Sequence, residues 1–230
     1  LKNNIPSIFV PTTHGTGSEV TMWATIWDMV NKKKYSISHP DLYPDIALLD
    51  PKLTISLPFE VSISTISDAL SHSFEALWNK NSTNYSTSLA VEAICIILKN
   101  IENIIEKKDS LIIKKDLLNA SCLAGKAISI TKTAAAHSMS YPLTIYFNIP
   151  HGIAASLFLN NFIEICKTYI NNELKNILFE CGLNNIDELK KKISYLLKSI
   201  KKDKLSDWGI EEKDIFFFNS SILFKPHSNK

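Results

Sequence analysis

The sequence lacks both an excess of charge and a long apolar run. Its 230 residues include 25 basic and 23 acidic ones, which leaves a formal net charge of +2. That balance creates no field that would attract nucleic acid or an anionic membrane surface. No stretch is long and apolar enough to cross a bilayer. We therefore expect neither nucleic acid nor a membrane as a partner, and the hydrophobic content of 45% is typical of globular proteins.

Paired cysteines are also lacking. The chain has four cysteines and no CxxC pair, so a disulfide framework is not expected. This usage predicts reduced, mostly buried thiols and a cytoplasmic protein. The four are Cys95, Cys122, Cys166 and Cys181.

Glycine is scarce in the second part of the chain, which favours helices there. Only Gly125 and Gly152 occur between residues 59 and 180. Apolar residues between 94 and 105 recur at the i, i+3, i+4, i+7 spacing of one helix face. The lysine-rich residues 190–204 show the same spacing, which predicts a solvated amphipathic helix. We expect a helical domain over residues 58–230.

Residues 1–57 have the pattern of an α/β segment. Short apolar runs at 8–10 and 46–49, bounded by prolines and polar turns, predict two strands. Between them, β-branched and aromatic residues on both sides of a polar turn at 31–34 predict a hairpin. The chain opens without Met and runs directly into a strand-like stretch. We expect it to be a fragment whose beginning is missing.

The run THGTGSE at residues 13–19 follows the first predicted strand. Glycine there permits positive φ and a close approach of the backbone to a ligand. Its N–H and hydroxyl groups suit phosphate or ribose oxygens. A plain tight turn has the same composition. These residues alone leave both interpretations open.

Three histidines and one aspartate form a candidate metal set. Asp68 and His72 are four residues apart in a helix-forming segment, so both side chains project from one face. His137 lies among small residues, and His151 stands between a proline and a glycine. Such an N₃O set suits divalent iron or zinc. Taken singly, each residue is more typical of surface polarity or of a hydrogen-bonded core histidine, and this alternative stays open.

Four runs carry a resemblance to a known family. VPTTHGTGSEVT, DPKLTISLP, DALSHSFEA and HSMSYPLTIYFNIPHG resemble the iron-containing (group III) alcohol dehydrogenases, over residues 6–160. The spacing of four between Asp68 and His72 and that of fourteen between His137 and His151 (151 − 137) match that family too. The resemblance implies the C-terminal part of an incomplete, Rossmann-like α/β nucleotide-binding domain over residues 1–57. An all-α metal-binding catalytic domain follows over 58–230, with the active site between the two.

The resemblance also implies site residues and cofactors. It implies hydride transfer between NAD(H) or NADP(H) and a small aldehyde or alcohol, and a homo-oligomer for the full-length protein. The implied ligands of Fe²⁺ or Zn²⁺ are Asp68, His72, His137 and His151. The implied cofactor-binding residues are Thr12, Thr13, Gly15, Thr16, Ser18, Lys34 and Leu53.

The chain departs from the family pattern at several places. Tyr141 stands where many members have histidine and is expected to donate or relay a proton. His14 replaces a usual alanine and would narrow the cofactor cleft or act as an acid near the substrate. Residues 216–230 replace the expected final helices, and the family's Gly-rich phosphate loop would precede residue 1. We therefore expect this chain to bind metal without turning over.

A subgroup resemblance concerns the substrate. Residues 19–28, 32–51 and 130–144 are most similar to members that reduce phosphonoacetaldehyde to 2-hydroxyethylphosphonate. An anionic substrate needs cationic or hydroxyl donors, which Lys132 and its neighbours Thr131 and Thr133 supply. An ordinary polar helix start is the alternative for these three. Other open alternatives for the chain are a zinc polyol dehydrogenase, a dehydroquinate-synthase-like lyase or an inactive, truncated metal-binding remnant.

Overall fold

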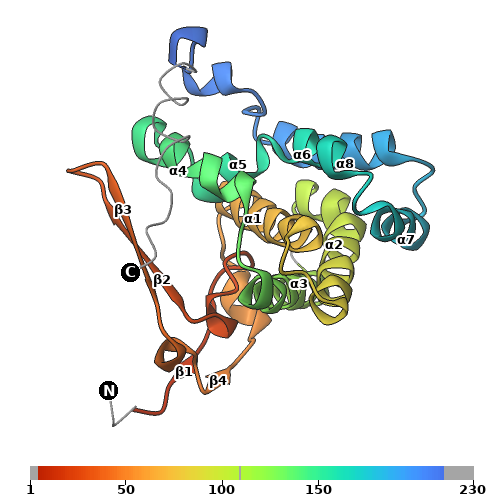
Figure 1. Cartoon of the computed structure of the whole chain (residues 1–230). Helices are drawn as coiled ribbons and strands as arrows, with labels where there is room; N and C mark the ends of the chain where they lie inside the picture. The colour runs from red at the N-terminus through yellow and green to blue at the C-terminus, as the bar shows by residue number, and fades with distance from the viewer. Residues whose placement is uncertain (1–4, 109, 215–230) are drawn as a thin grey trace.

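The computed structural model describes residues 5–108 and 110–214, in which short strands precede a body of helices (Figure 1). The first helix begins at Phe59, where the sequence predicts the change from mixed to helical structure. The helices are α1 (Phe59–Trp78), α2 (Asn84–Ile105), α3 (Leu111–Thr131), α4 (Ala135–Phe147), α5 (His151–Ser156), α6 (Leu159–Cys166), α7 (Asn171–Cys181) and α8 (Ile186–Lys198). No helix within the described ranges is long and apolar enough to span a membrane.

Helix α1 is the centre of the helical body. Nearly all of its residues from Ser62 to Leu77 are buried, because α2, α3, α4 and α5 all pack against it. Its buried face is not wholly apolar, and the exceptions include Asp68, His72 and Glu75. Polar side chains at such positions require partners from the surrounding helices.

The helix ends follow local sequence rules. Thr83, Ser110 and Asn185 cap the first turns of α2, α3 and α8 by accepting backbone N–H bonds. Helix α8 buries the apolar face that the lysine-rich segment predicts, but it ends at Lys198 instead of reaching residue 204. The chain leaves the helix there because Lys201 adopts a left-handed conformation with φ of 54°.

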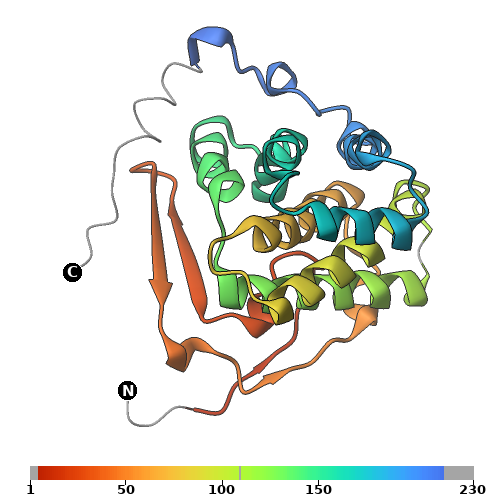
Figure 2. The same ribbon diagram turned by 45° about the vertical axis from the view of Figure 1, so that its right-hand side comes forward.

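The predicted strands are present in the first part of the chain. Strand β1 (Ile8–Phe9) pairs in parallel with β4 (Ile46–Ala47). Strands β2 (Trp23–Asp28) and β3 (Lys33–Ser38) form the predicted antiparallel hairpin, in a register that pairs Trp27 with Lys34. The turn lies at residues 29–32 instead of the predicted 31–34, because Lys33 and Lys34 already pair with β2. Figure 2 shows the hairpin standing beside the helical body. Each sheet of the described residues has two strands, so the Rossmann-like organisation stays a prediction.

The four cysteines are free thiols, as the sequence predicts. Cys95 and Cys122 are buried, whereas Cys166 and Cys181 are half-buried. The C-terminal departure at residues 216–230 lies outside the described residues.

Candidate metal centre

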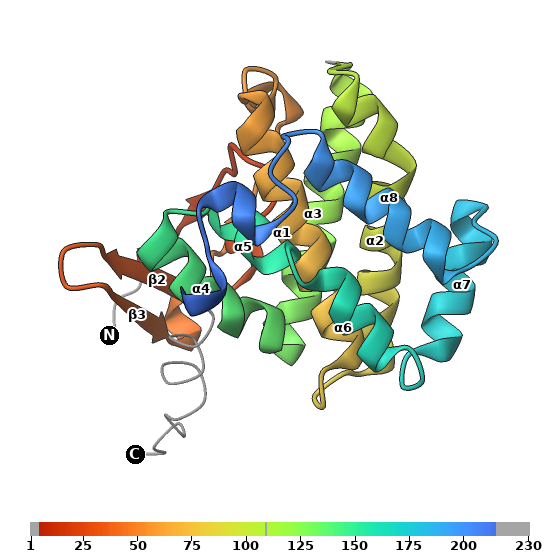
Figure 3. The same ribbon diagram turned by 90° about the horizontal axis from the view of Figure 1, so that it is seen from above.

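The four predicted ligands come from three helices that meet around α1. Asp68 and His72 lie one turn apart on its buried face, His137 lies in the first turn of α4, and His151 is the first residue of α5. Figure 3 shows α4 and α5 beside α1. The structure therefore brings together four side chains that are up to 83 residues apart in the sequence (151 − 68).

The ligand atoms converge on the Oδ1 atom of Asp68. It lies 3.2 Å from Nε2 of His137, 3.7 Å from Nε2 of His72 and 3.9 Å from Nε2 of His151. Ligand atoms held about 2.1 Å from a tetrahedral metal are roughly 3.4 Å apart. One ligand atom from each of Asp68, His72 and His137 fits within a span of 4.8 Å. The donor set and its spacing therefore fit a divalent transition metal.

Hydrogen bonds direct the imidazole lone pairs toward this point. The Ser140 hydroxyl donates its proton to the carbonyl of His137, so its oxygen accepts from Nδ1–H of His151, 3.3 Å away. The Nδ1–H of His137 donates to Glu75 over 2.7 Å. Both contacts place the proton on Nδ1 and leave Nε2 available as a ligand in the neutral ring. The Nδ1 atom of His72 is buried without a hydrogen-bond partner.

Glu75 is a functional residue that the sequence analysis missed. Its carboxylate is fully buried and also accepts the backbone N–H groups of Ala134, Ala136 and His137, at 2.8, 2.6 and 3.2 Å. It thereby caps α4, which has no cap of its own, and orients the His137 ring. The signal was its position three residues after His72, on the same helix face.

The two buried carboxylates of the site, Asp68 and Glu75, favour a bound positive charge. Burial opposes the ionisation of Asp68, but the imidazoles of His72, His137 and His151 outweigh it and hold the pKa of this carboxyl far below its usual range. Burial lowers the pKa of His72 to about 4. Burial also opposes charge on His137, but hydrogen bonds to Asp68 and Glu75 raise its pKa to about 9. Without metal, one cationic imidazole thus lies between two buried carboxylates.

A glycine brings α5 close enough to α1 to complete the cluster. A Cβ atom on Gly152 would lie 1.9 Å from the carbonyl oxygen of Ser64 and 2.9 Å from Cβ of Asp68. Only glycine allows that approach. Pro150 precedes the helix as its N-cap, where its fixed φ suits the helix start. His151 is consequently presented at the first turn of α5.

The hairpin closes one side of the cluster. The Trp27 ring contacts Tyr141 and His151 edge-on, with centroids 6.0 and 5.8 Å apart. The Nζ atom of Lys34 lies 3.3 Å from the Tyr141 ring centroid, and burial lowers the pKa of this lysine to about 8. Tyr141 itself stacks on His151. Two of the predicted site residues, Lys34 and Tyr141, therefore lie next to the cluster of four predicted metal ligands.

The glycine-rich turn at residues 13–19 packs against α1. A Cβ atom on Gly15 would lie 2.3 Å from the carbonyl oxygen of Thr65, so packing alone requires this glycine. Thr12, Thr16 and Ser18 are exposed and Thr13 is half-buried, which leaves their hydroxyls accessible. Leu53, in the turn Pro51–Thr54, is 45% exposed. Their role in cofactor binding stays a prediction.

The remaining two predicted residues lie in other surroundings. The His14 ring is fully buried and hydrogen-bonds the hydroxyl of Ser62 over 2.9 Å. Burial, together with Lys114, lowers its pKa to about 4, so the ring is neutral near pH 7. Lys132 is exposed just after α3, with φ of 66°. The predicted catalytic roles of both residues stay predictions.

Comparisons with known proteins agree with this geometry. Residues 62–223 match the model described as "Fe-containing alcohol dehydrogenase family, C-terminal", and residues 1–51 match "Iron-containing alcohol dehydrogenase". The probable alcohol dehydrogenase EutG of Escherichia coli strain K12 is 37% identical over 177 residues, which are 77% of this chain and 45% of that protein. The 4-hydroxybutyrate dehydrogenase of Clostridium kluyveri is 32% identical over an alignment of 233 positions, which covers 97% of this chain and 62% of that protein.

A solved structure shares the fold closely. The sulfoacetaldehyde reductase of Bifidobacterium kashiwanohense, crystallised with NAD⁺, superposes with a TM-score of 0.86 at 30% identity. The match covers 96% of this chain and 59% of that chain. The present chain thus spans about half to less than two thirds of the length of these relatives.

Proposed function

This chain belongs to the iron-containing alcohol dehydrogenase family, and from that premise we propose that it forms the metal-binding and catalytic part of an oxidoreductase. The proposed reaction transfers a hydride between NAD(H) and a small aldehyde or alcohol. The observation that carries the proposal is the convergence of Asp68, His72, His137 and His151 on one point.

The chain's own residues would prepare that site for a divalent metal. When bound, such a metal would polarise the carbonyl oxygen of the substrate as a Lewis acid. Glu75 holds His137, and Ser140 holds His151, in the orientation that a ligand needs. Trp27 covers one edge of His151, which limits the access of water from the hairpin side.

Tyr141 is proposed to hold a proton near the reacting oxygen. Burial raises the pKa of its hydroxyl, so it stays protonated at neutral pH. Thr133 acts in the opposite direction on the pKa of that hydroxyl, but burial outweighs it. The ring stacks on His151, so the phenol lies beside the metal ligands.

Cofactor binding is proposed for the side of the glycine-rich turn. The structural relative with NAD⁺ supports a dinucleotide as the hydride carrier. The exposed hydroxyls of Thr12, Thr16 and Ser18 would donate to its phosphate or ribose oxygens. Lys34 would supply a positive charge beside Tyr141, at the edge of the ligand cluster.

We further propose an anionic aldehyde, such as phosphonoacetaldehyde, as the substrate. Two relatives, the sulfoacetaldehyde reductase and the 4-hydroxybutyrate dehydrogenase, are named after small molecules that carry an anionic group. Lys132 and its hydroxyl neighbours would pair with that group, in a charge-assisted bond of about 1.5–3 kcal/mol. In an active, extended protein, Lys132→Ala should raise KM for phosphonoacetaldehyde roughly ten- to a hundredfold. Propanal, without a charge, is the control; equal losses on both aldehydes would point to damage at His137 instead.

The decisive experiment separates metal binding from turnover. The purified chain, stripped by chelator, is titrated with Co²⁺ or Zn²⁺, and one ion per chain is expected. Asp68→Ala and His137→Ala should each abolish that binding, whereas His39→Ala, at an exposed position, should not. Activity is followed through nicotinamide absorbance with Fe²⁺, NADH and an aldehyde. We expect none from this chain, and Fe²⁺-dependent turnover from a version extended to the length of the relatives; no metal binding would refute the proposal.

A further inference from the structure

The contact between α5 and α1 continues beyond Gly152 to the other end of α5. Gly152 and Ser156 are four residues apart on α5, so both lie on one face of that helix. On α1 they meet Ser64, Ser67 and Ser71, which recur at spacings of three and four residues. The two helices therefore touch at both ends of α5. Two of the four predicted metal ligands directly follow Ser67 and Ser71 in the chain.

The hydroxyl of Ser156 joins the two helices. Its oxygen lies 2.8 Å from the carbonyl oxygen of Ser67 on α1 and 2.8 Å from that of Gly152 on α5. The hydroxyl oxygen of Ser71 is also 2.8 Å away. Carbonyl oxygens only accept, so Ser156 directs its single proton to them and accepts the proton of Ser71. All three serines are buried, so water does not compete for these bonds.

His151, at the opposite end of α5, depends on this attachment. Helix α5 has no side-chain cap and is too short to be stable without its neighbours. The side chain of His151 is 32% exposed, whereas those of His137 and Asp68 are 3% and 7% exposed. Its Nε2 atom is also farther from Oδ1 of Asp68 than the Nε2 atoms of His72 and His137 are. The position of this ring is therefore set by how α5 lies on α1, more than by packing around the ring itself.

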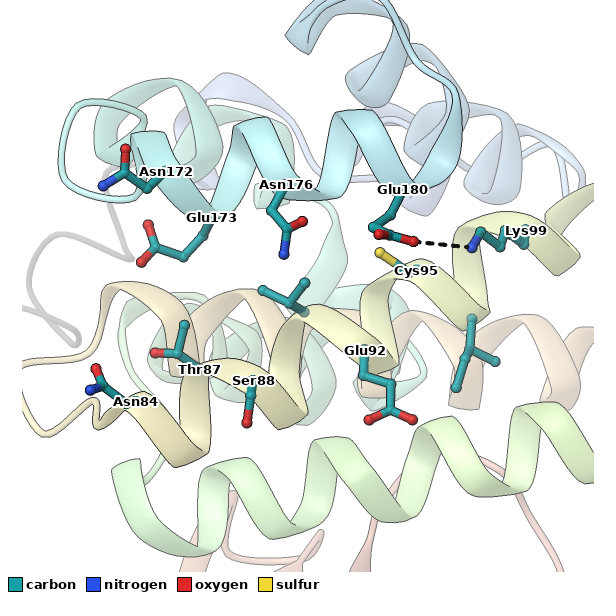
Figure 4. A pocket seen from close by; sticks show the side chains of 12 residues that line it. Asn84, Thr87, Ser88, Glu92, Cys95, Lys99, Asn172, Glu173, Asn176 and Glu180 are labelled. Carbon is teal, nitrogen blue, oxygen red and sulfur yellow. Dashed lines mark ion pairs between the residues drawn. The ribbon is translucent and has the colours of Figure 1, made fainter.

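The contact between α2 and α7 provides a contrast. A hollow of about 610 Å³ lies between these helices (Figure 4), and the ion pair between Lys99 and Glu180 joins them over 3.9 Å. Ser88 lines this hollow, but its hydroxyl donates to a carbonyl of its own helix over 2.8 Å. Ser73, fully buried on α1, also donates to a carbonyl of its own helix over 2.8 Å. Because these two bonds stay within one helix, both serines are suitable controls for Ser156.

We propose that Ser156 is a positioning residue of the metal centre, whose bonds to α1 hold α5 so that His151 reaches the point where the other ligands converge. The proposal rests on the proposed function, because it presupposes that the four ligands bind a metal. The hydroxyl of Ser156 is taken up by its bonds to the two helices, so this residue acts through the backbone of α5. Without that hydroxyl, α5 can shift on α1, and Nε2 of His151 moves relative to Oδ1 of Asp68.

The test compares Co²⁺ binding by the chelator-treated chain and by its Ser156→Ala variant. The visible absorption of bound Co²⁺ reports the number and arrangement of its ligands, which a loss of stability alone does not change. We expect Ser156→Ala to bind Co²⁺ about ten- to a hundredfold more weakly. Its spectrum should differ from that of the unaltered chain in the same direction as the spectrum of His151→Ala. Ser73→Ala and Ser88→Ala should keep both the affinity and the spectrum.

Ser71→Ala tests the same link from the side of α1. It removes the donor to Ser156 but keeps the bond to Ser67, so the Co²⁺ affinity should fall by less than in Ser156→Ala. The double variant should bind no more weakly than Ser156→Ala, because both substitutions act through one hydroxyl.

An unaltered affinity and spectrum in Ser156→Ala would overturn the positioning role, as would an equal change in Ser73→Ala. If circular dichroism shows that Ser156→Ala does not fold, Ser71→Ala decides by the same two measurements. A chain that binds no Co²⁺ before any substitution would refute the proposed function, and the positioning role with it. Tight binding by the unaltered chain together with an unaltered Ser156→Ala variant would refute the positioning role alone.

Discussion

At the scale of single residues, the metal centre depends on carboxylates that are buried among imidazoles. Glu75 is fully buried and satisfied by four donors, three of them backbone N–H groups of the segment that carries His137. It fixes both the direction of the His137 ring and the start of α4. A residue that contacts no metal can therefore control how well one binds.

We predict that Glu75→Gln lowers the affinity for Zn²⁺ or Co²⁺ about ten- to a hundredfold. The glutamine amide has a single acceptor oxygen, so it cannot accept hydrogen bonds from all four donors. Its NH₂ group would face N–H groups that donate to the carboxylate in the unaltered chain, and two donors cannot pair. Competition with a chromogenic chelator measures the affinity. Glu60→Gln, an exposed position on the same helix, is the control and should change nothing. An unaltered affinity in the Glu75 variant would contradict the assigned role.

His14 gives the folded chain a dependence on pH. Its pKa is about 4 when folded and about 6.5 when unfolded. Between these values the unfolded chain binds a proton that the folded chain does not, so the free energy of unfolding falls as pH falls from about 6.5 to 4. Protonation of His14 lowers the free energy of unfolding by about 3 kcal/mol at the acid end of this range, and has no effect on it above about pH 6.5.

His14→Gln should therefore flatten the acid side of the stability profile. Urea unfolding of the chelator-treated chain at pH 7 and pH 4.5 measures the effect. The difference between the two pH values should shrink by about 2–3 kcal/mol relative to the unaltered chain. His39→Gln, at an exposed histidine, serves as the matched control. Parallel profiles for the His14 variant and the unaltered chain would show that His14 is not the group that titrates.

At the scale of elements, the centre exists because α5 crosses α1 at close range. The Gly152 contact with the carbonyl of Ser64 sets that distance, and His151 is the adjacent residue. The hairpin adds a second contact, since Lys32 Nζ donates to the carbonyl of Ile145 on α4 over 2.9 Å. Helices α4 and α5 are thus held between α1 and the hairpin.

Gly152→Ala is predicted to separate α5 from α1 and to displace His151. The added methyl group meets backbone, which cannot rotate away, so overpacking should cost about 1–3 kcal/mol of stability. Metal affinity should fall as well, because one of the four ligands moves. Thermal unfolding and metal titration measure the two effects. Gly182→Ala is the contrast for metal affinity: its methyl group meets no atom within 4 Å, and its φ of 63° costs stability without moving a ligand. A weaker metal affinity in both variants would refute the explanation.

At the scale of the whole molecule, one metal would join three helices that otherwise meet through packing and a few hydrogen bonds, such as those of Glu75 and Ser156. The ligands come from α1, α4 and α5, and unfolding separates them. A ligand that binds only the folded state stabilises it in proportion to the logarithm of its concentration. Metal binding and folding are therefore linked in this chain.

Saturating Zn²⁺ should raise the Tm of the chelator-treated chain by about 8–16 °C. This corresponds to about 4 kcal/mol at a thousandfold excess over Kd, at 2–4 °C per kcal/mol. Differential scanning calorimetry measures the shift, and renewed chelation should reverse it. His72→Ala should remove most of it. An equal shift in that variant would mean that zinc binds elsewhere on the protein.

Sequence by itself determined the features that depend on neighbouring residues. The change from strands to helices at residue 59, the hairpin over residues 23–38 and the placing of Asp68 and His72 on one helix face all follow from local periodicity. Family motifs added His137 and His151 as partners. Helix α8 ends earlier than its periodicity predicts, because the spacing of apolar residues does not reveal that Lys201 adopts a left-handed conformation.

Tertiary structure alone decided which distant groups meet. No spacing in the sequence predicts that Glu75 caps α4 or that His14 is buried against Ser62. These contacts arise where separate helices pack, and packing depends on the shapes of whole faces rather than on local pattern. The pKa values of the buried groups follow from the same packing, because burial and neighbouring charges exist only once the helices are assembled.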